Sequence, residues 1–194
     1  MSPPKRRVRR GVEDARQRIL ETAEAHLAAD GPAGVKVQRI ARELGITDAG
    51  VNHHFGSREA LLEALLRFCG RRFVEELRAE VAARGEAPFD AGQAARLLLD
   101  FYGRRGTGRL AMWLMLSGWE PQGSGMLEPL VDWAWRSALL ATRRDCQKLV
   151  AVLSAVTLSQ ALSRDAILRS VGLDGVDEAD FLDWVARLAA SPRP

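Results

Sequence analysis

The residues with the most evident chemistry form a short polar run from Thr47 to His53. Thr47, Asn52 and His53 carry donors and acceptors that can bond to phosphate oxygens or base edges. Ala49 and Gly50 lie among them and are small enough for a large partner to approach closely. This combination favours recognition of a polar surface over catalysis.

The elements that must position this run form a helical corner. The residues before it recur at helical spacing and predict an apolar stripe through Val37–Leu44. Gly45 ends that helix because glycine adopts the left-handed conformation without steric cost. The side chain of Ile46 is expected to be buried. Thr47 is expected to be the N-cap of a second, short helix. A helix, a turn containing glycine and a short polar helix predict a helix-turn-helix, whose second helix enters the DNA major groove.

The flanks of the corner carry a family resemblance. An amphipathic helix is expected over Ala15–Ala29, and after the corner the chain reads Asn52-His53-His54-Phe55-Gly56-Ser57-Arg58-Glu59-Ala60-Leu61, with Ser57 capping a long helix. Over about Arg16–Leu66 the chain resembles the TetR family of one-component bacterial repressors. The resemblance implies a three-helix DNA-binding head, a helical C-terminal domain, a homodimer and a palindromic operator.

Three residues depart from the family pattern. Asn52 replaces the usual phosphate-binding tyrosine, and Lys36 replaces a threonine or serine cap, but both can still donate to phosphate. Asp48 stands where lysine is frequent, so it either accepts from a cytosine N4 or favours the positive end of its helix. We therefore expect Lys36, Thr47, Asp48, Ala49, Gly50, Asn52, His53 and Arg58 to face DNA, with Lys36 and Arg58 on phosphate.

The positive charge is concentrated at the start of the chain. The net charge is +3, and residues 1–10 hold five basic residues and no acidic one. Such a basic run can bind the DNA backbone or be a solubilising tail, and the neighbouring helix-turn-helix favours DNA. We expect residues 1–12 to be a flexible arm that contacts DNA through Arg6, Arg7, Arg9 and Arg10.

The rest of the chain predicts an all-α fold with about nine helices. Hydrophobic residues make up 47% of the sequence, and β-strand patterns are nearly absent. We expect a DNA-binding domain over residues 13–56 and an effector-binding and dimerisation domain over 57–194. The later helices are expected at Ser57–Arg84, Phe89–Tyr102, Arg109–Ser117, Met126–Arg143, Cys146–Val171 and Asp177–Ala190.

The last two of these helices predict the dimer interface. Leu149–Leu162 is apolar on nearly all faces, as expected for a helix buried on two sides. The final helix carries a stripe of Phe181, Trp184, Val185 and Leu188. The family resemblance implies a four-helix bundle with the partner's copies, and burial within the monomer is the alternative.

Aromatic and methionine side chains are concentrated in the segment that the family uses to line an effector cavity. Core filling and an adaptable apolar pocket are both compatible with these residue types. We expect a small apolar molecule, or a cation paired with Glu120 or Asp132. The candidate lining residues are Phe101, Tyr102, Met112, Trp113, Met115, Trp119, Trp133 and Trp135.

Other functions have little support in the sequence. The adjacent His53 and His54 point to different faces, and Cys69 and Cys146 lie far apart, so we expect no metal, cofactor or disulfide. No catalytic constellation is evident, so an enzyme is not expected. No run reaches 18 apolar residues, so we expect a cytoplasmic protein without a membrane span. The alternatives are a ligand-blind or architectural DNA-binding factor and a non-catalytic helical interaction module.

Overall fold

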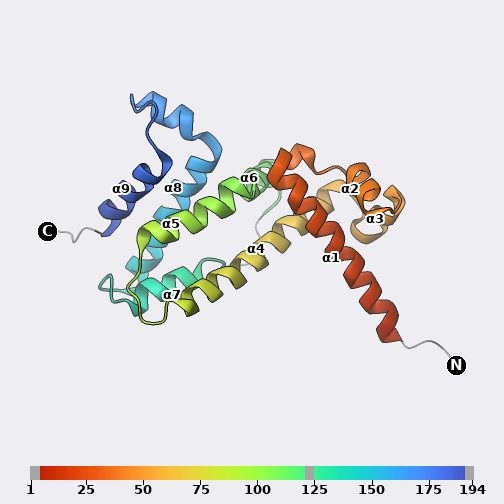
Figure 1. Ribbon diagram of the computed structural model, residues 1–194, viewed down its shortest axis with the longest axis horizontal. Helices are drawn as coiled ribbons and strands as arrows, with labels where there is room; N and C mark the ends of the chain where they lie inside the picture. The colour runs from red at the N-terminus through yellow and green to blue at the C-terminus, as the bar shows by residue number, and fades with distance from the viewer. Residues whose placement is uncertain (1–4, 121–124, 191–194) are drawn as a thin grey trace. The chain divides into compact units, whose positions relative to one another are not determined.

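The computed structural model describes the backbone of residues 5–120 and 125–190, and the side chains of residues 11–120 and 125–188. Within these residues the chain is all-α, as expected, and no strand is present (Figure 1). The helices are α1 (Lys5–Asp30), α2 (Val37–Leu44), α3 (Asp48–Phe55), α4 (Arg58–Ala83), α5 (Ala91–Leu99), α6 (Thr107–Leu116), α7 (Glu128–Arg136), α8 (Arg143–Ser170) and α9 (Glu178–Ala190), with a 3-10 turn η1 (Pro32–Gly34) and a π-helical turn η2 (Asp100–Arg104).

The described residues form two compact units. The first unit holds the described residues up to Cys69 together with Arg105–Glu120. The second unit holds Gly70–Arg104 and residues 125–190. The boundary therefore falls inside α4 instead of at Gly56. Helix α6, expected in the effector domain, belongs to the first unit because it packs on α1 and η1.

The core of the first unit is aliphatic. Ile19 and Leu27 of α1 are fully buried with Ile40 of α2, and Leu61 and Leu65 of α4 are fully buried in the same unit. Burying one such side chain contributes roughly 1.5 to 3 kcal/mol, so these helices hold together mainly through their apolar stripes.

Polar contacts fix the angle between α1 and α2. His26 is buried and its Nε2 lies 2.8 Å from Glu43 Oε2, and Arg39 of α2 pairs with Asp30 at the end of α1. Both contacts join the end of α1 to α2, the first helix of the predicted corner. They therefore help to position α2, on which α3 packs.

Helix α6 approaches α1 closely at Gly106. This glycine has φ 73°, and a Cβ there would lie 2.8 Å from the Leu27 carbonyl oxygen. Glycine is therefore required both for the left-handed conformation and for the space. Leu110 and Leu114 of α6 are buried behind it.

The core of the second unit is aromatic. Phe73 and Phe101 stack with ring centroids 4.1 Å apart. Trp133 is buried against Phe89, and its Nε1 donates to the Ala87 carbonyl oxygen at 3.0 Å. The indole N–H thus has a partner, as a buried tryptophan requires.

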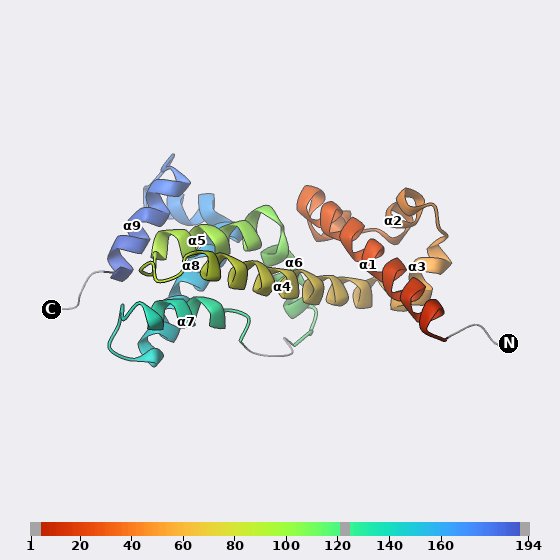
Figure 2. The ribbon, with the colours of Figure 1, turned by 60° about the horizontal axis from the view of Figure 1, so that its bottom comes forward.

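Helices α5 and α9 lie side by side in the second unit, and α5 also packs on α8 (Figure 2). Helix α8 buries one stripe through Leu149, Leu153 and Thr157, and its backbone is non-helical at Ser163. Among the described residues, α8 is the one helix that is long and apolar enough to cross a membrane. Of its most apolar 18-residue stretch, 33% is buried within the protein. A core helix passes the same test, so this is weak evidence for a membrane span.

The boundary between α7 and α8 differs from the expectation. Helix α7 ends at Arg136 and not at Arg143, because Ala138 adopts φ 49° and breaks the helix. Helix α8 then starts at Arg143 and not at Cys146, with Thr142 as its N-cap. The Thr142 hydroxyl oxygen accepts from the Asp145 backbone N–H at 3.1 Å.

Candidate nucleic-acid interface

The corner between α2 and α3 is built as the sequence predicts. Gly45 ends α2 in the left-handed conformation, with φ 66° and ψ 30°. The Ile46 N–H then donates to the Ala41 carbonyl oxygen at 2.9 Å, which closes the turn. The expected burial of Ile46 is wrong, since its side chain is 41% exposed.

Helix α3 has a buried side and an exposed side. Val51 is completely buried, whereas Asp48, Ala49, Asn52 and His53 are exposed. At about 100° per residue these four positions share one arc of about 140° on the helix. From its first residue to His53, α3 therefore presents a continuous face of small and hydrogen-bonding side chains.

The start of α3 is held by its cap. The Thr47 hydroxyl oxygen accepts from the Gly50 N–H at 3.1 Å. A Cβ on Gly50 would lie 3.4 Å from that oxygen, so a small residue suits the position. Asp48 lies exposed in the first turn, where its charge favours the positive helix end; a contact to cytosine stays a prediction.

The C-terminal end of α3 is fastened to α1 by Arg16. Its Nη1 donates to the His54 carbonyl oxygen, and the guanidinium carbon lies 4.1 Å from the centroid of the Phe55 ring. A cation over an aromatic face stabilises by roughly 0.5 to 1 kcal/mol at an exposed site. Arg16 thus helps to fix the orientation of the exposed face.

Arg58 is directed into the first unit and not toward solvent. Its Nε donates to the Val35 carbonyl oxygen at 3.0 Å and its Nη2 to the Pro32 carbonyl oxygen at 2.7 Å. The guanidinium also lies over the Trp113 ring. Arg58 thus ties α4 to η1 and α6, and its expected phosphate contact stays a prediction.

Two basic residues beside α3 are exposed. Lys36 precedes α2 as an N-cap without a side-chain bond, so its ammonium group is directed to solvent. Arg42 of α2 is also exposed, and the sequence-based prediction did not include it. Its position outside the Val37–Leu44 apolar stripe was the signal that could have found it.

The basic run at the start of the chain is helical in backbone. Helix α1 begins at Lys5, so the backbone of residues 5–12 belongs to this helix. Residues 1–4 lie outside the described residues, as do the side chains of Arg6, Arg7, Arg9 and Arg10. Their contact with DNA stays a prediction.

The eight candidate effector residues are divided between the two units. Met112, Trp113, Met115 and Trp119 belong to the first unit, whereas the other four belong to the second. Phe101, Tyr102 and Trp133 fill the core of the second unit, and Trp135 is 44% exposed. This burial is compatible with the core-filling alternative, and an effector contact of these residues stays a prediction.

Tyr102 has a polar partner within that core. Its Oη lies 2.8 Å from Ser154 Oγ, and burial raises the pKa of the phenol although the bond to Ser154 opposes this. The hydroxyl is therefore neutral at physiological pH and is used inside the protein.

Metal and thiol chemistry have no geometric basis in the described residues. No group of three or more His, Cys, Asp or Glu side chains could hold a metal ion there. Cys69 and Cys146 are both buried and form no disulfide, and burial raises the pKa of Cys146.

Comparison with known proteins assigns the corner to a family. The model of bacterial regulatory proteins of the tetR family matches residues 19–65. The HTH-type transcriptional regulator BetI 2 of Chromohalobacter salexigens is 33% identical over 82 residues, which are 42% of this chain and 38% of that protein. The chain thus spans little more than a third of the length of this relative.

Solved structures share the fold over nearly the whole chain. The multidrug binding protein EbrR complexed with ethidium is 25% identical, with a TM-score of 0.53 over 97% of this chain and 99% of its own. A structure on the control of antibiotic production by bacterial hormones is 22% identical, with a TM-score of 0.56 over 88% and 96%.

The all-α fold and the helix-turn-helix corner define a class of helical regulators. The match to bacterial regulatory proteins of the tetR family covers residues 19–65, which contain this corner, and the similarity to BetI 2 covers 42% of the chain.

Proposed function

We propose that the protein is a DNA-binding transcriptional regulator, and specifically a ligand-responsive repressor that binds a palindromic operator as a homodimer. The observation that carries the proposal is the exposed face of α3, formed by Asp48, Ala49, Asn52 and His53 behind the Gly45 turn. The match of residues 19–65 to the tetR family supports it. Such a regulator meets DNA in the cytoplasm and performs no catalysis.

In this proposal α3 enters the major groove. The small side chains of Ala49 and Gly50 allow the helix backbone to approach the bases, and Asn52 and His53 reach their edges. An asparagine amide can make two hydrogen bonds to adenine, worth roughly 1 to 3 kcal/mol of discrimination. Lys36 and Arg42 lie exposed on α2 and its cap, where they can pair with phosphate.

Dimerisation in this proposal uses the apolar side of α8 that the chain itself leaves open. Val152 is 54% exposed and Leu162 is 36% exposed, and both lie outside the buried stripe of the helix. On α9, Trp184 is 53% exposed and Leu188 is 62% exposed. Burying these side chains against a second copy removes them from water and gives the two heads the symmetry of a palindrome.

Ligand response is supported by the solved relatives. EbrR is described as a multidrug binding protein in complexes with imidazole, ethidium and proflavin. A ligand that prefers one arrangement of the two heads shifts the equilibrium between binding and released states. The ligand-blind DNA-binding factor is the alternative, and it predicts that no compound alters operator affinity.

Selection of bound fragments from random DNA by the full chain tests the proposal. We expect enrichment of one inverted repeat with half-sites spaced by whole helical turns, about 10 base pairs or a multiple. Recovery of unrelated fragments, with no sequence enriched over the input, contradicts sequence-specific regulation. The enriched fragment then serves for every binding measurement below.

A further inference from the structure

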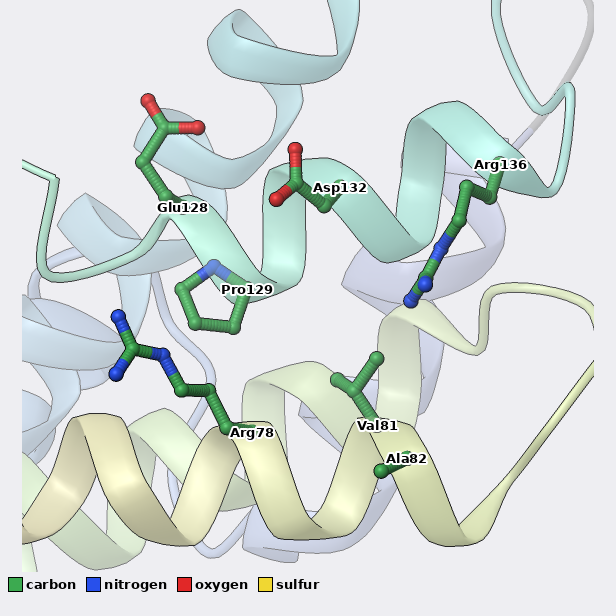
Figure 3. A pocket seen from close by; sticks show the side chains of 7 residues that line it. All are labelled: Arg78, Val81, Ala82, Glu128, Pro129, Asp132 and Arg136. Atoms are coloured by element: carbon green, nitrogen blue, oxygen red, sulfur yellow. The ribbon is translucent and has the colours of Figure 1, made fainter.

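A hollow lies between α4 and α7 in the second unit, away from the aromatic residues expected to bind an effector. Its volume is about 260 Å³. Figure 3 shows that Arg78, Val81 and Ala82 enter from α4, and Pro129 and Arg136 from α7. The remaining lining residues are the two carboxylates of α7, Glu128 and Asp132.

Both carboxylates are already engaged by one arginine. Arg143 Nη2 at the start of α8 lies 2.6 Å from Glu128 Oε2 and 2.7 Å from Asp132 Oδ1. In Figure 3 both carboxylates point away from α4. The expected pairing of Asp132 with a cationic ligand therefore has to compete with Arg143.

This arrangement leaves Arg136 without its natural helical partner. Asp132 and Arg136 are four residues apart on α7, a spacing at which opposite charges usually pair. Arg143 instead takes the Asp132 carboxylate, and Arg136 extends toward Val81. Among the described residues neither Arg136 nor Arg78 makes an ion pair.

The hollow thus combines two available guanidinium groups with an apolar centre. Arg78 comes from one helix and Arg136 from the other, and Pro129 and Val81 lie between them (Figure 3). The three arginines and two carboxylates around the hollow sum to +1. Guanidinium groups bind carboxylates through paired hydrogen bonds, and the apolar centre suits a hydrocarbon chain.

We propose that this hollow binds a small organic dicarboxylate, with one carboxylate on Arg78, the other on Arg136, and its chain packed between Pro129 and Val81. The volume of about 260 Å³ lies just below the range of ligand pockets, roughly 300 to 1,000 Å³, so the site suits a small metabolite. That the dicarboxylate releases operator DNA rests on the function proposed above; its binding to the free protein does not.

Calorimetric titration of the full chain with straight-chain dicarboxylates from succinate to azelate tests the site. We expect one length, such as adipate, to bind best, and hexanoate and inorganic phosphate to bind at least about ten-fold more weakly, a difference of about 1.4 kcal/mol. 1,6-Diaminohexane should not bind. Equal binding of phosphate, or no binding of any dicarboxylate, overturns the proposal.

Variants separate direct contact from general charge. Arg78→Gln and Arg136→Gln should each weaken the best dicarboxylate at least about ten-fold, whereas Arg144→Gln, an exposed arginine of α8, should leave it unchanged. If all three variants bind as the wild type does, the ligand binds elsewhere and the proposal fails.

Arg143 provides a second test, because it acts as a positioning residue. Arg143→Gln frees Asp132 to pair with Arg136 and should weaken binding. Adding Asp132→Asn and Glu128→Gln to this variant should restore binding, since the competing carboxylates are then neutral. A triple variant that remains as weak as Arg143→Gln contradicts the role given to Arg143.

Operator affinity measured on the same preparations distinguishes the two proposals. A protein that binds the dicarboxylate but no selected DNA contradicts the function proposed above and leaves this site standing. A protein that binds the selected DNA but no dicarboxylate contradicts only this site.

Discussion

Arg58 lies over the indole ring of Trp113, with 5.6 Å between the guanidinium carbon and the ring centroid. The same guanidinium donates to the carbonyl oxygens of Val35 and Pro32. One side chain at the start of α4 thus joins the turn before α2 to α6. Arg58 therefore contributes to the structure of the first unit.

Replacing Arg58 by Gln should therefore destabilise the protein. The variant lacks two hydrogen bonds from a charged donor, and we expect the free energy of unfolding to fall by about 2 kcal/mol. Urea denaturation measures this change. The matched control is Arg42→Gln, an exposed arginine without a partner in the described residues, which should leave stability unchanged and weaken DNA binding. If Arg58→Gln instead weakened DNA binding and left stability unchanged, Arg58 would be a DNA contact and not a structural residue.

The basic start of α1 should add affinity without specificity. Replacing Arg6, Arg7, Arg9 and Arg10 by Gln keeps the helix and removes the charge, which is a cleaner change than deleting part of α1. We expect binding to selected and random DNA to weaken alike. The slope of log affinity against log salt should fall by about 0.9 for each phosphate that the variant no longer neutralises. An unaltered slope would mean that these residues do not meet DNA.

The exposed apolar faces of α8 and α9 should hold the dimer. Val152→Glu or Trp184→Glu places a charge in that interface, and we expect monomers in sedimentation at micromolar concentration. These positions are better tests than Val185, which is 8% exposed and so packs within its own chain. Gln147→Glu, an exposed change on α8, is the control and should remain dimeric. A monomeric wild type would contradict the interface.

The local rules of the corner could be predicted from the sequence. The apolar stripe of α2, the left-handed Gly45 and the Thr47 cap each depend on a few adjacent residues, and all three are present. Ile46 was wrongly expected to be buried because an apolar residue after a turn carries no information on which side it faces. Exposed isoleucines are common enough that residue type alone does not decide.

The effector residues could not be predicted in the same way. Trp133 and Phe101 are of residue types that often line ligand pockets. Whether such side chains pack on each other or line a cavity depends on residues distant in sequence. Trp133 bonds to Ala87, 46 positions away, and Phe101 stacks on Phe73. The inward turn of Arg58 likewise depends on backbone carbonyls that carry no sequence signal.

The central claim is that the exposed face of α3 reads DNA, and the binding of α3 variants to the selected fragment tests it most directly. We expect Asn52→Ala and His53→Ala each to weaken specific binding by about 1 to 3 kcal/mol, and to leave binding to random DNA, the fold and the oligomeric state unchanged. Gln17→Ala, an exposed residue of α1, is the control and should bind as the wild type does. If both α3 variants bind the selected fragment with wild-type affinity in a fluorescence anisotropy titration, α3 is not the reading helix and the account is contradicted.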